Sequence, residues 1–210
     1  REGIGNMIGV LDYGIGNIGS ILNMIQKVGA QGCAVTNAQE TEACEKLILP
    51  GVGAFDTGMQ LLEKSGMRSA LDHAVALGKP VLGICLGMQM LGVCSEEGTR
   101  EGLCYVPFQL KRFAFAEPSG LKIPHMGWDE VKVCKPASSL VQGLEAEPRF
   151  YFVHSYYAIC EHCDDELMIC DYGHPFVAAV QHNNVWGTQF HPEKSHRFGM
   201  CLIRNFAKEC

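Results

Sequence analysis

Short apolar runs alternate with helical patterns through the first half of the chain, and this alternation limits the fold more than any other feature. The runs lie at residues 8–11, 33–35, 47–49 and 81–84, and each is apolar almost throughout. Strands without a polar face are typical of a parallel sheet that is covered by helices on both faces. The sequence therefore predicts an α/β fold.

The positions of the other elements follow from the spacing of apolar residues and from turn signals. Helices are predicted at 17–28, at 55–77 with a break at Ser65-Gly66, and at 86–93. The second half is richer in strands, which we expect at 108–113, 130–133, 150–153, 156–160, 167–171, 176–181 and 185–189. We therefore expect a flavodoxin-like, mostly parallel sheet flanked by helices, with added antiparallel strands in the C-terminal half.

Two local signals mark the end of the chain. The pair Asn183-Asn184 is typical of a hairpin turn between the last two strands. Ser195 is predicted to be the N-cap of a terminal helix that runs to about Lys208. Ligands of such folds bind outside the carboxyl ends of the parallel strands, so the residues that follow the strands are the ones to inspect.

Composition restricts the class of protein. With 210 residues, 47% hydrophobic and 19% charged, the chain fits one globular domain, which we place at 7–210. Residues 1–6 precede Met7 and are interpreted as an expression remnant or an upstream extension. A net charge of −6, with no basic cluster longer than Lys111-Arg112, argues against nucleic-acid binding. No run reaches the ~18 apolar residues of a membrane span, so we expect a cytoplasmic protein.

Cys85 lies between two glycines, directly after an apolar run and directly before a helical pattern. The stretch Gly83-Ile84-Cys85-Leu86-Gly87 is the cysteine counterpart of the nucleophile elbow, a strained turn that exposes a nucleophile at the end of a sheet. Flanking side chains would clash in so sharp a turn, and its backbone needs unusual dihedral angles. The N-terminus of the following helix favours the thiolate. A buried structural cysteine is the alternative interpretation of this motif alone.

A second segment supplies what a cysteine nucleophile needs. His191 and Glu193 are two residues apart with Pro192 between them, so in an extended segment their side chains share a face. An imidazole that accepts the thiol proton, and a carboxylate that orients the imidazole, would complete a catalytic triad. Taken alone, this tripeptide would be an ordinary turn; together with the elbow it indicates nucleophilic catalysis.

From about Met7 to its C-terminus the chain resembles the class I, or triad, glutamine amidotransferases. The motifs shared with that class are Pro50-Gly51-Val52-Gly53, Gly83-Ile84-Cys85-Leu86-Gly87-Met88-Gln89 and Gln189-Phe190-His191-Pro192-Glu193. Within the class it is most similar to the glutaminase subunits of imidazole glycerol phosphate synthase, from histidine biosynthesis. The markers of that group are Asp12-Tyr13-Gly14 with Gly16-Asn17, Pro124-His125-Met126-Gly127-Trp128 and Tyr151-Phe152-Val153-His154-Ser155-Tyr156-Tyr157.

The resemblance implies hydrolysis of L-glutamine to L-glutamate and ammonia through a thioester on Cys85. His191 would act as general base and acid, and Glu193 would orient it. The backbone N–H groups of Leu86 and Val52 would stabilise the oxyanion, with the glycines beside Val52 allowing its peptide to rotate. No cofactor and no metal ion is implied.

Substrate contacts also follow from the resemblance. Glutamine would be held by Gly53, by Gln89, which shares a helix face with Cys85, and by the backbone of Ser155 and Tyr156. Glu97 is a weaker expectation for binding the substrate amino group, because the acidic run around it also fits a solvated loop.

The resemblance further implies a partner, because free ammonia would be lost to solvent. That partner would be the (β/α)₈-barrel cyclase subunit of imidazole glycerol phosphate synthase, which makes imidazole glycerol phosphate and AICAR in a heterodimer with this chain. Asn17, Trp128 and Lys194 would lie on the docking surface. Trp128 falls in a segment that we expect to be a loop bounded by Gly and Pro, and it fits an interface and a core position equally well. His154 is interpreted as a structural histidine.

The eleven cysteines show no pairing pattern, and most are interpreted as reduced apolar residues of a cytosolic protein. Cys160-Glu161-His162-Cys163, with Cys170 nearby, is the exception. It could bind zinc, but no second CxxC completes four ligands, and a hairpin tip between strands 156–160 and 167–171 is the favoured alternative.

Three rival functions remain open from the sequence. The chain could be the glutaminase of a paralogous synthase, such as a sugar amidotransferase system, in which the docking motifs would persist. It could be a cysteine peptidase or chaperone-like protein on the same sheet, although that leaves Gln89 and the Pro50–Gly53 motif without a purpose. A scaffold with a decayed site is disfavoured because Cys85, His191 and Glu193 are all present.

Overall fold

Five parallel strands form the centre of the fold in the computed structural model, which describes residues 7–116 and 119–210. In sheet order β2-β1-β3-β4-β12, the strands span Gln31–Val35, Met7–Leu11, Lys46–Gly51, Val81–Cys85 and Val185–Thr188. The expected parallel core is confirmed. The predicted extension at residues 1–6 lies outside the described residues.

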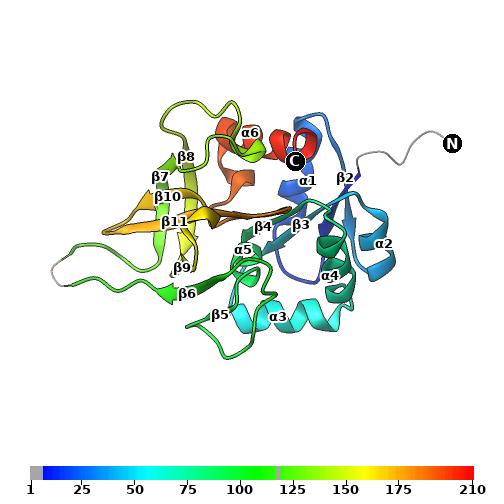
Figure 1. Cartoon of the computed structure of the whole chain (residues 1–210), viewed down its shortest axis with the longest axis horizontal. Helices are drawn as coiled ribbons and strands as arrows, with labels where there is room; N and C mark the ends of the chain where they lie inside the picture. The colour runs from blue at the N-terminus through cyan, green and yellow to red at the C-terminus, as the bar shows by residue number, and fades with distance from the viewer. Residues whose placement is uncertain (1–6, 117–118) are drawn as a thin grey trace.

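Antiparallel strands extend the sheet beyond β12, as the sequence predicted. β12 pairs in parallel with β4 on one side and antiparallel with β11 on the other, and the order then continues through β10 and β7 to β8. The strands are β11 (Pro175–His182), β10 (Glu166–Asp171), β7 (His125–Val133) and β8 (Arg149–His154). Beside them lie β9 (Tyr156–Cys160), β6 (Phe108–Arg112) and β5 (Cys94–Ser95). Figure 1 shows them at the end of the molecule farthest from β2.

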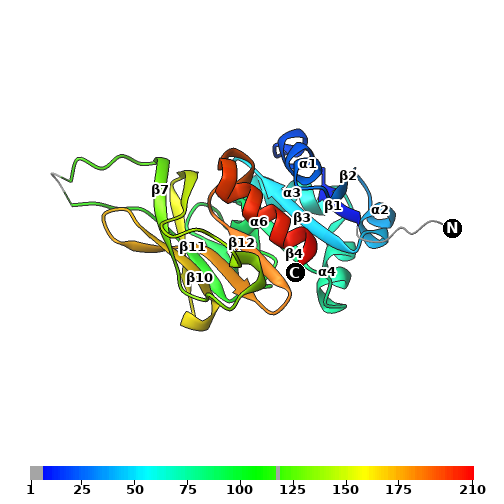
Figure 2. The same cartoon turned by 90° about the horizontal axis from the view of Figure 1, so that it is seen from above.

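Helices cover both faces of the parallel strands (Figures 1 and 2). One face carries α1 (Ile18–Lys27) and α6 (His196–Lys208). The other carries α3 (Phe55–Lys64), α4 (Arg68–Ala76) and α5 (Leu86–Met90). The remaining helical segments are α2 (Ala38–Ala43), η1 (Ser139–Val141), η2 (Cys163–Asp165) and η3 (Pro192–Lys194).

The two faces are built from alternate residues of each strand. Ile48 packs on the side of α1 and α6, whereas its neighbours Leu47 and Leu49 pack on the side of α3, α4 and α5. Leu82 and Val81 divide in the same way between the two sides. This period of two explains why the strands appear as continuous apolar runs, because both of their faces are buried.

Local signals at the turns are confirmed in part. Asn183 and Asn184 form the two-residue loop between β11 and β12, and Asn183 takes a φ of 51° that suits such a turn. Ser195 stands at the N-cap of α6 as predicted, but its side chain does not cap the helix. Its hydroxyl instead donates to the carbonyl of His191 at 2.6 Å and accepts the N–H of Tyr151 at 3.1 Å.

Some boundaries differ from the expectation. β7 begins at His125 and not at residue 130, so the segment that includes Trp128 is a strand and not a loop. Pairing with β8 over residues 125–130 outweighs the local Gly and Pro content. α5 ends at Met90 and not at residue 93, and the short elements α2 and β5 were not predicted.

The segment with the CxxC pattern is not a hairpin tip. It connects β9 to β10, but β9 pairs with β6 and β11, whereas β10 pairs with β11 and β7. Cys163 is exposed and Cys160 is partly buried. Within residues 7–116 and 119–210, no group of three or more His, Cys, Asp or Glu side chains is placed to hold a metal ion.

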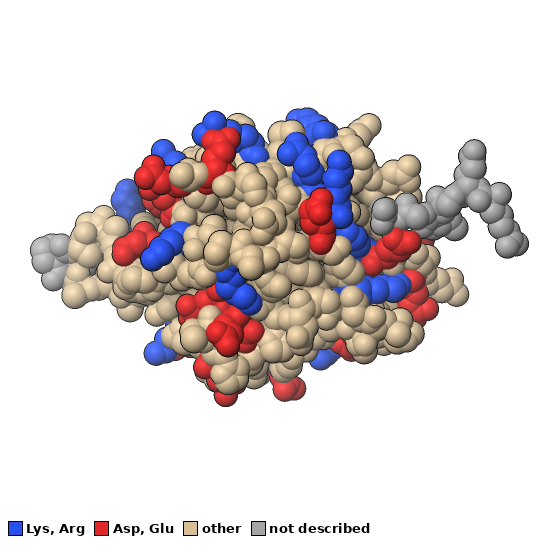
Figure 3. Space-filling model, turned by 45° about the horizontal axis from the view of Figure 1, so that its top comes forward, with Lys and Arg blue, Asp and Glu red and all other residues tan. Residues whose placement is uncertain are grey.

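Charges of both signs are mixed on the face of the molecule that Figure 3 draws. On the face drawn in Figure 3, acidic and basic side chains are interspersed around a broad area with neither. In the described part of the chain, no helix is both long and apolar enough to cross a bilayer.

Lys46 ties the parallel sheet to the end of α6. Lys46 is 7% exposed, and its ammonium donates to the carbonyls of Phe206 and Ala207 at 3.1 and 2.9 Å, which helix geometry leaves unpaired. We expect Lys46→Met to lower the free energy of unfolding by about 1–3 kcal/mol, because those carbonyls would lose their partner. Urea denaturation measures this, with the exposed Lys64→Met as a control expected to change stability by less than about 0.5 kcal/mol. Equal losses in the two variants would contradict the role of Lys46.

Candidate active site

Cys85 stands at the turn between β4 and α5. Its backbone adopts φ 55° and ψ −111°, a conformation that costs a residue with a side chain on the order of 1–3 kcal/mol. The residue is the N-cap of α5 and is 8% exposed. A strained residue at a strand-to-helix turn is the geometry that the elbow motif predicted.

The two glycines of the motif are required by space. A Cβ on Gly87 would lie 1.7 Å from the carbonyl oxygen of Leu49, and one on Gly83 would lie 2.7 Å from the carbonyl oxygen of Gly87. Neither glycine has a positive φ; the unusual dihedral angles belong to Cys85 itself. The expectation that side chains would clash is therefore confirmed, and the unusual dihedral angles expected of the turn fall on Cys85 and not on the glycines.

The pairing of β12 with β4 brings the C-terminal motif to Cys85. Thr188 lies opposite Ile84 in the parallel register, so Gln189 follows beside Cys85. The Gln189 side chain is fully buried, and its Nε2 lies 3.9 Å from Sγ of Cys85. His191 comes two residues later, at the carboxyl end of the same strand. Residues more than a hundred positions apart thus meet through a single strand pair.

His191 and Glu193 form a buried pair. Nδ1 of His191 lies 2.7 Å from Oε1 of Glu193, and both side chains are at most 3% exposed. The backbone N–H of His191 donates to the backbone carbonyl of Tyr151 at 2.9 Å, which holds His191 against β8. Among the described residues, Nε2 of His191 has no hydrogen-bond partner. Because Nδ1 is taken by Glu193, Nε2 is the ring nitrogen left to interact with the neighbouring Cys85.

The surroundings of His191 favour its protonated form. Burial opposes the charged imidazolium, but the neighbouring Cys85 thiol and the Glu193 carboxylate outweigh burial and raise the pKa of His191 to about 9. An imidazole with this pKa carries a proton at neutral pH. It can therefore act as the acid toward a leaving group, and a neighbouring thiolate can balance its charge.

Cys85 and His191 share the wall of a cavity of about 310 Å³. The cavity also brings together most of the residues that the sequence singled out: Val52, Gly53, Leu86, Gln89, Glu97, Ser155 and Tyr156. Pro124, Val153 and His154 complete its lining. Glu193 lies behind His191, and the three residues expected at a partner interface lie outside the cavity.

A model of the glutamine amidotransferase class-I family matches residues 9–210. The chain belongs to this family. It is 50% identical over 203 residues to imidazole glycerol phosphate synthase subunit HisH 2 of Pseudomonas aeruginosa, covering 96% of this chain and 99% of that protein. It is 46% identical to imidazole glycerol phosphate synthase subunit HisH of Leptospira interrogans, with the same coverage.

Solved structures share the fold at lower sequence identity. PurLQS from Thermotoga maritima superposes with a TM-score of 0.74 at 18% identity, covering 95% of this chain and 96% of the other. A glutamine amidotransferase from the same organism superposes with a TM-score of 0.60 at 14% identity, covering 89% of this chain and 76% of the other. At these identities the likeness concerns the fold of the amidotransferase domain.

The loop after β3 lines the cavity of this amidotransferase together with His191. Val52 is 47% exposed, and Gly53 has a φ of 104° that disfavours any other residue. The carbonyl of Pro50 accepts a hydrogen bond from the buried hydroxyl of Tyr13 at 2.5 Å. Burial, and secondarily the nearby Cys85, raise the pKa of Tyr13, so its hydroxyl keeps the proton that it donates. The start of the loop is therefore held while Val52 faces solvent.

Sequence reasoning did not assign a role to Tyr13 or to Gln189. Nε2 of Gln89 donates to Oε1 of Gln189 at 2.9 Å, so the predicted substrate contact Gln89 is positioned by a residue at the carboxyl end of β12. Both missed residues lay within motifs that had been singled out. The available signal was a polar side chain that directly follows an apolar strand.

Glu97 reaches the cavity through a loop that is fastened to α3. Its Oε2 accepts the N–H of Phe55 at 2.8 Å, and the Asp56 carboxylate accepts the N–H groups of Thr99 and Arg100. Glu97 therefore lies in an exposed turn, as the alternative interpretation expected, but its carboxylate caps the start of α3.

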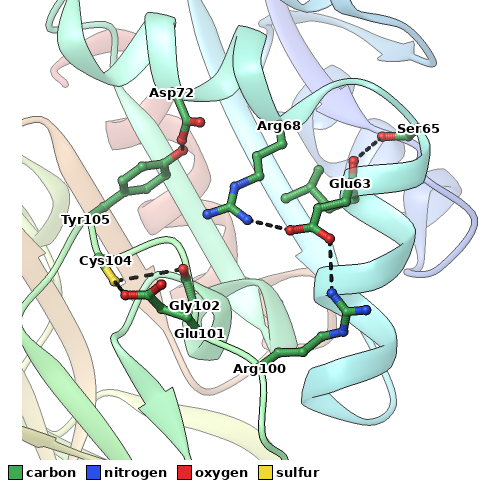
Figure 4. A network of polar contacts seen from close by, with 10 residues as sticks. Glu63, Ser65, Arg68, Asp72, Arg100, Glu101, Gly102, Cys104 and Tyr105 are labelled. Atoms are coloured by element: carbon green, nitrogen blue, oxygen red, sulfur yellow. Dashed lines mark hydrogen bonds and ion pairs between the residues drawn. The ribbon is translucent and has the colours of Figure 1, made fainter.

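The same loop is tied down further along (Figure 4). Glu63 pairs with Arg68 at 2.6 Å and with Arg100 at 3.0 Å, and the hydroxyl of Tyr105 donates to Asp72. Exposed ion pairs of this kind stabilise only weakly, but together these contacts hold the loop against α3 and α4.

The three residues expected at an interface lie on the surface. Trp128 is 37% exposed and stacks on His196 with 5.2 Å between ring centroids. The Lys194 ammonium lies 5.6 Å from the centre of the Tyr151 ring, which also contacts Trp128. Asn17 is exposed at the start of α1, where its side chain accepts the N–H of Ser20. Trp128 is therefore not a core residue.

Proposed function

We propose that the chain hydrolyses L-glutamine to L-glutamate and ammonia, as the glutaminase subunit of an imidazole glycerol phosphate synthase in histidine biosynthesis. The observation that carries the proposal is the meeting of Cys85 with the His191–Glu193 pair at one cavity. The relatives at 46–50% identity bear the name of that synthase subunit. We propose that residues 7–210 form a single glutaminase domain that acts in the cytoplasm.

Catalysis would proceed through a thioester. The Cys85 thiolate adds to the side-chain amide carbon of glutamine, and the carbonyl electrons move onto oxygen. As that oxyanion collapses, the carbon–nitrogen bond breaks, and His191 donates its proton to the departing ammonia. His191 then takes a proton from water, whose oxygen adds to the thioester carbon. Collapse of this second intermediate releases glutamate and returns the Cys85 sulfur to its starting state.

The surrounding groups would stabilise charge and hold the substrate. Glu193 orients His191 through Nδ1, and the N–H groups of Leu86 and Val52 are the proposed oxyanion donors. Removing one such donor from an enzyme typically costs ~2.7–4 kcal/mol of barrier. We assign the glutamine contacts to the cavity residues Gly53, Gln89, Glu97, Ser155 and Tyr156.

The partner proposed for this subunit is a (β/α)₈-barrel cyclase that receives the ammonia. Apolar side chains are exposed near the cavity: Met126, 61% exposed, precedes Trp128 by two residues on β7, and Val52 lies on the cavity wall. We place the docking surface over Trp128, Lys194 and Asn17. Exposed Trp and Met with a flanking Lys suit a protein interface.

Binding of the loaded cyclase is expected to raise glutamine turnover by about 10²–10³-fold. The reason is that the exposed Val52 loop would present its N–H to the oxyanion only after docking, and one such donor is worth that factor. The measurement compares the rate of glutamate release by the isolated chain with that of the complex in the presence of the cyclase ligand. Equal rates would rule out gating by the partner.

Growth of a histidine auxotroph that lacks this subunit tests the pathway. Restored growth supports the histidine synthase. Glutaminase activity without restored growth would favour the second candidate, a paralogous synthase such as a sugar amidotransferase system.

A further inference from the structure

Two buried histidines lie at the cavity that we propose binds glutamine, one in its wall and one behind it, and the proposed reaction does not use them. His125 on β7 and His154 on β8 stand directly opposite each other in the antiparallel register. They are 1% and 5% exposed. His154 lines the cavity itself, and Pro124, which precedes His125, lines it too. The pair is thus positioned to affect the shape of the cavity.

Three short contacts connect this pair to the cavity wall at one end and to the surface at the other. Nδ1 of His154 lies 2.7 Å from the carbonyl oxygen of Tyr156. Nε2 of His154 lies 3.0 Å from Nδ1 of His125. Nε2 of His125 lies 2.6 Å from Oδ2 of Asp129. All three distances are those of hydrogen bonds.

These contacts need more protons than two neutral imidazoles supply. A carbonyl oxygen and a carboxylate only accept, so the nitrogens that face Tyr156 and Asp129 must each carry a hydrogen. The two nitrogens that face each other need one hydrogen between them. Three hydrogens are required, whereas a neutral imidazole has a single N–H. The arrangement therefore calls for one additional proton.

Neighbouring rings do not provide that proton. Tyr172 stacks on His125 with 4.0 Å between ring centroids, but its hydroxyl donates to the carbonyl of Lys122 at 2.9 Å. His191, whose charge acts on His154, is paired through Nδ1 with Glu193.

The proton can come from solvent through Asp129. The side chain of Asp129 is 41% exposed, so the outer end of the chain of contacts is accessible to water. Asp129 also acts on the buried Cys170 thiol, whose pKa is raised by burial and by Asp129 and whose Sγ points to the carbonyl of Asp171 at 3.9 Å. The Cys170 thiol stays protonated, so it does not change the number of hydrogens that the three contacts require.

We infer that Asp129, His125 and His154 form a relay that holds one shared proton and thereby positions the Ser155–Tyr156 segment of the cavity. The inference rests on the proposed function only for the identity of the ligand. When the proton is absent, one of the three contacts joins two unprotonated atoms and weakens. The carbonyl of Ser155 is held separately by the N–H of Phe113 at 3.0 Å, so the carbonyl of Tyr156 is the point that loosens.

The direction of the pH effect follows from burial. Burial lowers the pKa of His125, although Asp129 opposes this shift, and burial lowers the pKa of His154 to about 3, with the charges of His125 and His191 acting in the same direction. The shared proton therefore resides on His125 beside the carboxylate. It is taken up as the pH falls below the ordinary imidazole value of ~6.5. The cavity wall is firmest on the acid side of neutrality.

The first test counts protons on the full chain, labelled with ¹⁵N-histidine and followed by NMR between about pH 8 and pH 5. In the wild type, the ring nitrogens of His125 and His154 should report uptake of one proton shared by the pair. In Asp129→Asn this uptake should vanish, because the amide N–H of Asn can donate to the bare Nε2 of His125. Glu130→Gln, which removes the adjacent exposed carboxylate, is the matched control and should titrate as the wild type. Absence of uptake in the wild type, or equal uptake in Asp129→Asn, would overturn the relay.

The second test measures glutamine binding calorimetrically with Cys85→Ala, which cannot turn the substrate over. Affinity should rise by about threefold to tenfold between about pH 8 and pH 5.5, the worth of one hydrogen bond. Adding Asp129→Asn should make affinity independent of pH. A relay that titrates without any change in affinity would disprove the positioning role. No glutamine binding at any pH would instead count against the proposed function, and the NMR result would still decide the relay.

Discussion

Replacing Cys85 by alanine is expected to lower glutamine hydrolysis by about 10³-fold or more, both in the isolated chain and in its complex. The substitution removes the sulfur on which we propose that the thioester forms, while the cavity remains. The measurement is glutamate release under saturating glutamine. Cys134→Ala, at an exposed cysteine outside the cavity, is the matched control and should keep full activity.

Covalent labelling tests the role of Cys85 as the nucleophile without a measurement of turnover. A glutamine-mimicking electrophile should add once to the wild-type chain despite its eleven cysteines, and excess glutamine should suppress the addition. Intact-mass spectrometry should find no adduct on Cys85→Ala. Competed labelling that persists in this variant would show that another cysteine is the nucleophile.

Gly87→Ala is expected to destabilise the fold by about 3 kcal/mol or more. The new Cβ would lie 1.7 Å from the backbone oxygen of Leu49, so β3 and α5 would have to separate where Cys85 is positioned. Urea denaturation should show a much lower midpoint, and activity should be lost in the molecules that still fold.

The control for that substitution is a glycine with open space around it. Gly19 lies in α1, and a Cβ there meets nothing within 4 Å. Gly19→Ala should be neutral or should stabilise by up to about 1 kcal/mol, because alanine favours helix. Similar midpoints for the two variants would mean that the contact between Leu49 and α5 is not tight in solution.

The elbow could be predicted because its determinants are adjacent in sequence. The two glycines, the apolar strand before Cys85 and the helix after it lie within a few residues. The sequence also predicted the parallel core, in which β1, β3, β4 and β12 are buried on both faces and therefore stand out by composition.

Long-range pairing explains what the sequence did not reveal. The contact between Gln89 and Gln189 depends on the register of β12 against β4. Likewise, the relay exists only because β7 pairs with β8 so that His125 faces His154. Hydrophobic patterns locate strands but do not give their register with partners far along the chain.

Two short elements were missed for a different reason. β5 has two residues, and α2 is polar and six residues long, so neither has a marked apolar periodicity. For α2 a usable signal was present: Asn37 accepts the N–H of Glu40, and the Glu40 carboxylate reaches back to the N–H of Thr36. A capping pattern of this kind could have located the helix.

The place of β12 in the sheet also has a consequence for biosynthesis. Among the described strands, β12 comes last in the sequence, yet it lies in the middle of the sheet and brings His191 to the side of Cys85. A nascent chain that lacks it would already carry its nucleophile but no base. Ammonia release would therefore begin only once translation has passed β12, which protects the cell from futile glutamine consumption by incomplete chains.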